Sequence, residues 1–162
     1  MIALTFPLLV AMTANGADES ANETQVRGVW SDPSTGLMWA GKDNDENATW
    51  RKATRHCSDL RLAGYSDWRL ATIEELEGLY DGSAYNSLPI RQGVTYILGG
   101  KAKGGLFLSG TYHWSSSRVP DDRGRPSGYA WQAWQYYFRG GRKHAEPLGY
   151  HQRALCVRRS VR

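Results

Sequence analysis

The chain has 162 residues, 41% of them hydrophobic, which is enough for one domain with a hydrophobic core and too short for two domains to be expected. Seven Trp, nine Tyr and 18 Gly predict a fold with much irregular structure, held together by large side chains. The net charge of +4 is uneven, because residues 1–100 hold 8 Lys and Arg against 13 Asp and Glu, whereas residues 101–162 hold 12 against 3. Such a basic region favours anionic partners, namely nucleic acid, acidic glycan or an anionic membrane surface, although a basic surface can also serve only to keep a protein soluble.

The first residues have the pattern of a secretory signal peptide. Residues 1–17 contain an apolar run followed by small residues suited to cleavage, although no Lys or Arg precedes the run. The run is too short for a transmembrane helix, which needs about 20 apolar residues. We therefore expect an exported protein without a transmembrane segment, in which residues 18–25 form a linker and residues 26–162 form the domain.

A β-hairpin is predicted at the start of the domain. Val26 to Trp30 form the first strand, and Leu37 to Trp39 begin the second. The DPSTG sequence between them suits a turn, because Pro presets φ, Asp can bond the backbone that follows, and Gly accepts a positive φ.

The next loop, KDNDEN, has part of the pattern of a calcium-binding loop. Asp43, Asp45 and Asn47 have the first three oxygen spacings, but Ala48 stands where Gly is needed and Thr54 where Glu is needed. We therefore predict a solvated loop that leads into a helix. Neither a metal ion nor another cofactor is expected.

An amphipathic helix is predicted from Trp50 to a stop at Gly64. Its apolar side recurs at helical spacing and consists of Trp50, Ala53, Cys57 and Leu60. The side that faces away carries Arg51, Lys52, Arg55 and Asp59.

A short strand at residues 68–70 and a second helix follow. Thr72 and Glu75 have the spacing of a capping box, which marks the start of that helix. Its buried side is expected to contain Ile73, Leu76, Leu79 and Tyr80.

The second half of the chain predicts a long loop and several antiparallel strands. Residues 83–111 are glycine-rich and weakly patterned, and a loop of that length in a compact domain is usually functional or mobile. Strands are expected at residues 112–117 and 129–138, the second with a bulge or bend because its aromatic alternation changes phase. A hairpin turn at residues 139–142 and a last strand at residues 154–158 complete the chain. This order of elements predicts an α+β fold.

A recognisable set of residues spans roughly residues 27–159. It comprises Asp32-Pro33, Thr35-Gly36-Leu37 and Trp39, then Trp50, Ala53 and Cys57, then LAGYSDWRL at residues 62–70, Thr72, Glu75 and Leu76, and finally Trp114-Ser115-Ser116, Phe138, Gly140 and Cys156-Val157-Arg158. In these marks the chain resembles the Lcl C-terminal domain family, which is named for the end domain of a bacterial collagen-like adhesin. The GYSDWRL run is the most specific part of the resemblance.

The resemblance implies a C-type-lectin-like fold related to the formylglycine-generating enzyme domain, with two helices packed on antiparallel sheets and long irregular loops. Cys57 and Cys156 are the two cysteines, and in that fold such residues bridge the first helix to the last strand. A disulfide also agrees with export. It leaves no thiol for formylglycine chemistry, and the four histidines show neither metal-ligand spacing with one another nor a His/Ser/Asp or Cys/His arrangement. We therefore predict a protein that is not an enzyme.

Two features often linked to sugar binding have simpler explanations here. Glu146-Pro147 is similar to the Glu-Pro-Asn motif of calcium-dependent lectins, but Leu148 replaces the Asn and no Trp-Asn-Asp triplet precedes Cys156. The tryptophans at family-pattern positions are expected in the core instead of a ligand platform. They are Trp39, Trp50, Trp68, Trp114 and Trp131.

The residues left for recognition are basic and lie in the C-terminal third. They are Arg118, Arg123, Arg125, Arg139, Arg142, Lys143 and His144. The planar fork of arginine suits sulfate, carboxylate and phosphate. The adhesin that names the family is associated with sulfated polysaccharides, so the resemblance implies an anionic glycan at the cell surface or envelope as the ligand, and no nucleic acid is expected. The alternative is a protein–protein interaction module of the bacterial envelope with contacts from residues 83–111; the oligomeric state is left open.

Overall fold

The computed structural model describes residues 28–84, 100–121, 123–124 and 131–160. The signal peptide and linker predicted before residue 26 lie outside this part of the chain. Within it the chain forms two helices and eight strands, which confirms the predicted α+β class. The C-type-lectin-like assignment stays a prediction.

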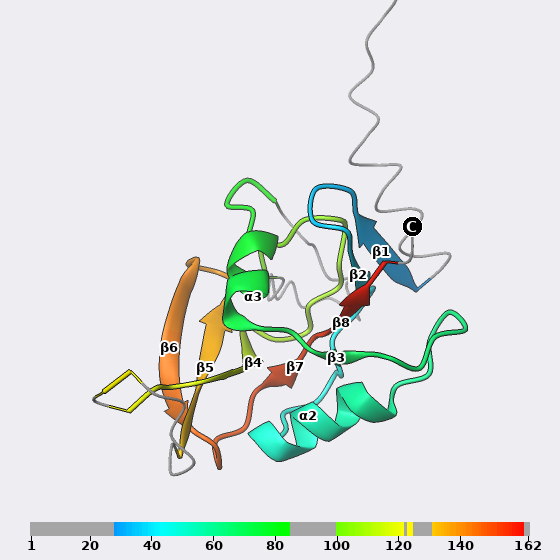
Figure 1. The fold of residues 1–162 in the computed structure, drawn as a ribbon. Coiled ribbons are helices and arrows are strands. Elements are labelled where there is room, and N and C mark those ends of the chain that lie inside the picture. The colour runs from blue at the N-terminus through cyan, green and yellow to red at the C-terminus, as the bar shows by residue number, and fades with distance from the viewer. Residues whose placement is uncertain (1–27, 85–99, 122, 125–130, 161–162) are drawn as a thin grey trace, which may run out of the picture.

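The strands form two sheets of four, seen side by side in Figure 1, with helix α2 (Trp50–Asp59) along the lower edge and helix α3 (Ile73–Leu79) above it. The first sheet is antiparallel and has the order β1 (Val29–Asp32), β2 (Leu37–Ala40), β8 (Cys156–Arg159), β3 (Arg69–Leu70). The second is antiparallel except for its last pair and has the order β6 (Arg142–Pro147), β5 (Gln132–Tyr137), β4 (Tyr112–Arg118), β7 (Arg153–Ala154).

The predicted N-terminal hairpin is formed by β1 and β2. The Asp32 carboxylate accepts hydrogen bonds from the Ser34 backbone N–H at 2.9 Å and the Ser34 hydroxyl at 2.6 Å. Gly36 then takes a φ of +67°, a conformation that costs glycine little. The DPSTG turn therefore works as its residue types predict.

Helix α2 is shorter than predicted. Ala53 and Cys57 are buried and the charged side faces solvent, as expected, but the helix ends at Asp59 and not near Gly64. The chain turns at once, because Leu60 is extended, Ala63 and Gly64 both have positive φ, and the Leu62 and Tyr65 backbones bond to each other. A positive φ at a residue other than glycine is uncommon, which is why Ala63 was taken for helix.

The capping box at α3 is confirmed. The Thr72 hydroxyl accepts a hydrogen bond from Glu75 N–H at 3.3 Å, and Glu75 Oε2 accepts one from Thr72 N–H at 2.8 Å. Arg69 binds both oxygens of the same carboxylate, at 2.7 and 2.6 Å. Residues Ile73, Leu76 and Leu79 are buried as predicted.

Two predictions about the strands are wrong. The irregularity predicted within residues 129–138 lies instead on β4, whose pairing with β5 shifts between Trp114 and Arg118. The last strand is divided: β7 joins the second sheet and β8 joins the first, with Leu155 between them. A run of alternating residues does not reveal that its two halves pair with different sheets.

The interior consists of two clusters of buried side chains. The cluster around α3 contains Trp39, Ala71, Ile73, Leu76, Leu79, Ala102, Leu106, Leu108, Tyr136, Phe138, Leu155 and Val157. The cluster around α2 contains Val29, Ala40, Ala48, Ala53, Cys57, Trp68, Leu70, Trp114, Ala133, Ala154 and Cys156. The predicted disulfide between Cys57 and Cys156 is present and lies in the second cluster.

The clusters also correct two expectations about burial. Leu106 and Leu108 are fully buried, so this end of the long loop predicted at residues 83–111 belongs to the core. Trp39, Trp68 and Trp114 are buried as predicted, but Trp131 is 66% exposed. A Trp at the start of a strand has the same sequence signature whether it points into the core or out of it.

Candidate functional site

The loop after β2 is largely exposed as predicted, but Asp43 departs from that prediction. Its side chain is fully buried, and its carboxylate accepts five hydrogen bonds. They come from the Asp45 backbone at 3.1 Å, the Ser109 backbone at 2.8 Å and hydroxyl at 2.6 Å, the Gly110 backbone at 3.3 Å, and His113 Nε2 at 2.9 Å. No local pattern of residues indicates this cluster, because three of the donor residues follow Asp43 by 66 to 70 positions.

The hydrogen bonds keep Asp43 ionised. Burial would by itself raise the pKa of its carboxyl group, but the hydrogen bond and charge of His113, with the bonds from Ser109 and Asp45, bring that pKa below its ordinary value. A carboxylate only accepts, so the hydrogen shared with His113 sits on Nε2. The neighbouring Asn44 exchanges hydrogen bonds with Ala154 of β7, which fastens the whole loop to the second sheet.

The arrangement of Asp43, Ser109 and His113 differs from that of a catalytic triad. In a triad the imidazole lies between the carboxylate and the serine hydroxyl, and it takes the proton of the serine. Here the carboxylate lies in the middle, and both the Ser109 hydroxyl and His113 bond to it. The cluster fixes the backbone at Ser109 and Gly110 and does not activate the hydroxyl.

The basic residues predicted as the ligand site are divided between the two ends of β5. Arg118 pairs with Ala133 near the start of this strand, whereas Arg142 pairs with its last residue. Four steps along a strand correspond to about 13 Å. Arg123 is exposed in the loop after β4, and Arg125 lies outside the described residues. The residues predicted to form one site therefore form two separate groups.

The part at the β5–β6 turn is exposed but partly neutralised. It consists of Arg139, Arg142, Lys143 and His144. Lys143 Nζ lies 3.0 Å from a carboxylate oxygen of Glu77 and 5.7 Å from the centre of the Trp134 ring. This lysine therefore already has an acidic and an aromatic neighbour.

Arg118 belongs with helix α2. Its guanidinium carbon lies 4.9 Å from the centre of the Trp50 ring, a cation–π contact, and Trp50 is the first residue of α2. The Trp50 ring is itself fixed, because its Nε1 donates a hydrogen bond of 2.8 Å to the Ser115 carbonyl. The guanidinium is thereby placed beside the first turn of the helix.

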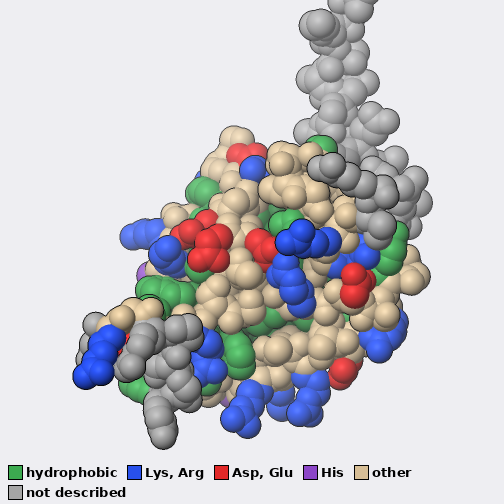
Figure 2. Space-filling view, in the orientation of Figure 1, with side chains coloured by type: hydrophobic (Ala, Val, Ile, Leu, Met, Phe, Trp, Pro, Cys, Tyr) green, Lys and Arg blue, Asp and Glu red, His purple; other side chains and the backbone are tan. Residues whose placement is uncertain are grey.

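The outer side of α2 adds a basic surface that the sequence prediction did not include. Together with Arg118 it forms what we call the α2 basic face: Arg51, Lys52, Arg55, Arg61 and Arg118. Figure 2 shows Lys and Arg side chains gathered at the lower edge of the molecule, over the position of α2 in Figure 1. Among the described residues, none of these five side chains takes part in an ion pair. The face was missed because residues 1–100 carry a net negative charge, and only the helix brings these cations together.

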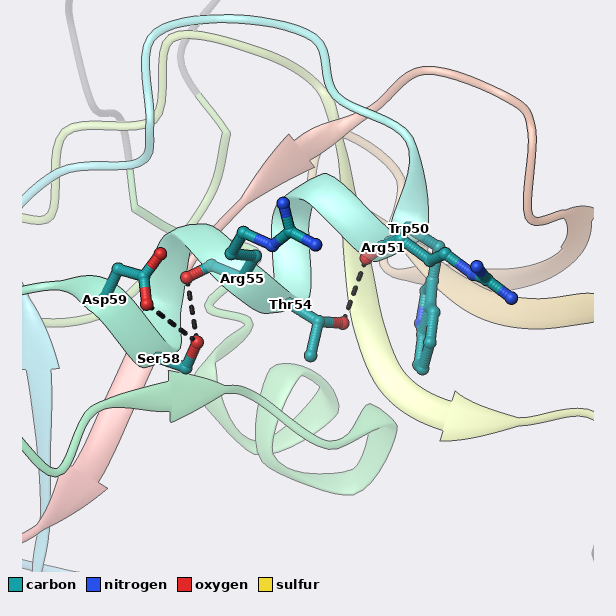
Figure 3. A pocket seen from close by; sticks show the side chains of 6 residues that line it. All are labelled: Trp50, Arg51, Thr54, Arg55, Ser58 and Asp59. Atoms are coloured by element: carbon teal, nitrogen blue, oxygen red, sulfur yellow. Dashed lines mark hydrogen bonds between the residues drawn. The ribbon is translucent and has the colours of Figure 1, made fainter.

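The hydroxyl groups on this side of the helix bond back to the helix itself. Figure 3 shows the Thr54 hydroxyl bonded to the Trp50 carbonyl and the Ser58 hydroxyl bonded to the Arg55 carbonyl, both at 2.9 Å. Two shallow hollows run along the helix, and Arg55 lines both of them. The groups on this face that are available for an outside ligand are therefore the guanidinium and ammonium groups together with one carboxylate, that of Asp59, which also lines both hollows.

The most specific run of the sequence, GYSDWRL, holds the fold together. Arg158 of β8 binds both oxygens of the Asp67 carboxylate, at 2.7 and 3.1 Å, and its guanidinium carbon lies 3.6 Å from the centre of the Tyr65 ring. Arg69 is paired with Glu75 at the start of α3. These residues join the first sheet to both helices.

The whole-chain comparison agrees with that architecture. A family model described as the Lcl C-terminal domain matches residues 28–158. The chain belongs to this family. The match covers both sheets and both helices of the Lcl C-terminal domain, including the ion pairs of Asp67 and Glu75. A search of curated proteins found no match. In the part of the domain that the structure describes, no helix has the length and apolar character needed to cross a bilayer.

Proposed function

We propose that this Lcl C-terminal domain is an exported, non-catalytic binding domain that recognises anionic glycans. The observation that carries the proposal is the α2 basic face, a row of cations on one side of a helix and its neighbouring strand. Cations without ion-pair partners keep their full attraction for an outside anion. A sulfated or acidic polysaccharide presents its charges at repeated intervals, as a row of cations requires.

The geometry of the face supports a polymer over a small ion. Arg51 and Arg55 line one shallow hollow, and Lys52, Arg55 and Arg61 line the next, so the cations follow one another along the helix. Arg118 extends the row past Trp50. The β5–β6 turn offers a second, weaker group of cations, because Lys143 already pairs with Glu77.

Export and the absence of catalysis are parts of the same proposal. A disulfide joins Cys57 to Cys156, and disulfides persist in oxidising compartments such as the periplasm or the cell exterior. Both cysteines are thereby used for structure. The Asp43 cluster places its serine and histidine on the same carboxylate, which is an arrangement for holding a loop.

A salt-dependent binding assay with matched charge variants tests the proposal. The first variant changes Arg51, Lys52 and Arg55 to Gln, which preserves helix propensity, and the second changes Arg139, Arg142 and Lys143 to Ser. The control changes Lys42, Lys103 and Arg159 to Gln, which removes the same charge from exposed positions elsewhere. We expect the parent to bind heparin at low salt and its affinity to fall steeply as salt is raised. The α2 variant should lose at least tenfold in heparin affinity. The turn variant should lose less affinity, and the control should lose least.

Two results would contradict the proposal. One is a parent that does not bind heparin or dextran sulfate even at low salt. The other is an equal loss in the α2 variant and the control, because that would show an effect of net charge alone. A loss confined to the turn variant would move the site back to Arg139, Arg142 and Lys143.

A second candidate function is a protein–protein module of the envelope, and one observation favours it. Trp131 and Tyr150 are large aromatic side chains that are 66% and 56% exposed. They lie at the same edge, because Leu148 N–H donates a hydrogen bond of 2.9 Å to the Trp131 carbonyl. Exposed aromatic residues are enriched at protein interfaces. If the parent binds no anionic glycan, this edge becomes the leading surface.

A further inference from the structure

A separate polar hollow lies beside β7 and shares no lining residue with the α2 basic face. It has a volume of about 310 Å³, within the size range of small-molecule sites, and it is lined by Asn47, Ser109, Thr111, Tyr112, Gln152 and Arg153 together with the backbone of Gly110. None of these lining residues is acidic. Arg153 is their one charged side chain, so the hollow offers a single positive charge surrounded by hydroxyl and amide groups.

Arg153 has no protein partner for its charge in the described part of the chain. Its Nε is buried without a hydrogen-bond partner, and its guanidinium group makes no ion pair there. A buried donor that remains unsatisfied is costly, and such groups are rare in folded proteins. The Nε–H itself is covered by the protein, but an anion in the hollow would give the guanidinium the charge partner that it lacks among the described residues.

The protein holds Arg153 in this position firmly. Arg153 pairs with His113 across the parallel β4–β7 contact, and its side chain lies against Gly110. A Cβ atom on Gly110 would lie 2.5 Å from Arg153 Cγ and 2.9 Å from Nε, so only glycine leaves room for the arginine. Gly110 cannot retreat, because the buried Asp43 carboxylate binds its N–H and that of Ser109.

The remaining lining groups suit a sugar ring. Thr111 and Tyr112 present hydroxyl groups, and Asn47 and Gln152 present amides that can both donate and accept hydrogen bonds. The Tyr112 ring is stacked on Tyr137 at 4.7 Å, which fixes its place in the wall. A guanidinium can donate two parallel hydrogen bonds to the two oxygens of a carboxylate, which a lysine ammonium cannot do in the same plane.

We propose that this hollow binds one carboxylate-bearing sugar residue, a uronic acid, whose carboxylate is received by Arg153. The inference rests on the proposed function and deepens it, since it names the sugar that the glycan contains. The α2 basic face would attract the polymer through its overall charge, and the hollow would select for a uronic acid within it. Neutral sugars lack the carboxylate. In a sugar 6-sulfate an ester oxygen holds the anion farther from the ring than a uronate carboxylate, so the anion and the ring do not meet Arg153 and the polar wall in the same positions.

The test titrates the full-length folded domain with glucuronate, glucose and glucose 6-sulfate at constant ionic strength, followed by NMR shift changes. We expect saturable binding of glucuronate, at least tenfold tighter than that of glucose or glucose 6-sulfate. Arg153→Lys keeps the charge but loses the planar guanidinium, and Gly110→Ala displaces the arginine. Each change should therefore lower the affinity for glucuronate at least tenfold. Gly149→Ala, where an added Cβ meets no atom within 4 Å, should bind as the parent does.

The outcomes separate this inference from the proposed function. Equal binding of glucuronate and glucose, or undiminished binding by both Arg153→Lys and Gly110→Ala, would overturn the uronic acid site. If heparin still binds through the α2 basic face in that case, the proposed function stands and the hollow alone is wrong. In the expected case Arg153→Lys weakens polygalacturonate but not dextran sulfate, which has no carboxylate. The α2 variant should bind both polymers more weakly than the parent and should bind free glucuronate as tightly as the parent does.

Discussion

His113 Nε2 donates a hydrogen bond of 2.9 Å to the carboxylate of Asp43, 70 residues earlier in the chain, and both side chains are fully buried. This contact joins the loop before α2 to β4. The same carboxylate holds the Ser109 and Gly110 backbones that form one wall of the polar hollow. A buried hydrogen bond between an imidazole and a carboxylate thus supports that wall.

Asp43→Asn should destabilise the domain by about 3 kcal/mol. An amide cannot accept every bond that the carboxylate accepts, so at least one buried N–H or imidazole donor would face the NH₂ group. Urea unfolding at neutral pH measures the loss. Asp45→Asn is the control, since Asp45 is exposed and its ion pair with Lys42 is on the surface, so the change should be within about 0.5 kcal/mol.

The contribution of Asp43 should disappear in acid. Its pKa in the folded protein lies below the ordinary value of 3.8, so its stabilising effect is fully present above about pH 4 and is lost as the pH falls through the lower, folded value. The stability difference between the parent and Asp43→Asn should therefore shrink below pH 4. Unfolding curves between pH 7 and pH 2 test this, and a difference that stays constant over that range would contradict it.

Removal of calcium should leave the melting temperature unchanged. Both oxygens of Asp43 are occupied by protein donors, which leaves the exposed Asp45 and Asn47 without the additional ligands that calcium requires. Melting curves with and without EDTA measure the effect. A fall of several degrees that calcium restores and magnesium does not would show that a metal site was overlooked.

Loss of the disulfide should cost on the order of 4 to 5 kcal/mol, because Cys57 and Cys156 are 99 residues apart and the bridge restricts a long loop of the unfolded chain. Cys57→Ala with Cys156→Ala removes the bridge without leaving a free thiol. Urea unfolding of this variant and the parent gives the difference, and mass spectrometry of unreduced peptides confirms the pairing. Two free thiols in protein purified from the periplasm would contradict the disulfide.

Local chemistry made much of the fold predictable. The DPSTG turn, the Thr72–Glu75 capping box and the α2 face with Ala53 and Cys57 all depend on residues within a few positions of one another, and all were predicted correctly. The failures involve long-range pairing. Nothing near Leu155 shows that the strands on its two sides belong to different sheets.

The candidate site was harder to predict for the same reason. The sequence showed a basic C-terminal third, but Arg118 of β4 and Arg142 of β6 pair with opposite ends of β5. The larger basic surface formed on a helix from the acidic part of the chain. Arg153 has no motif around it. Its position depends on Gly110, which leaves room for its side chain, and on Asp43, which binds the Gly110 N–H. These residues lie near Arg153 only because β4 pairs with β7.

The division of the last strand has a consequence for when the domain can fold. β3 is paired only with β8 in the first sheet, and β7 closes the edge of the second, so residues 153–159 complete both sheets. These residues follow in sequence the other strands that the structure describes, so they are synthesised after those strands. Until they arrive, Cys57 has no partner and both clusters of the core are open on one side. We therefore expect the domain to fold as a unit only after these residues have been synthesised, when they can pair with strands from both halves of the sequence.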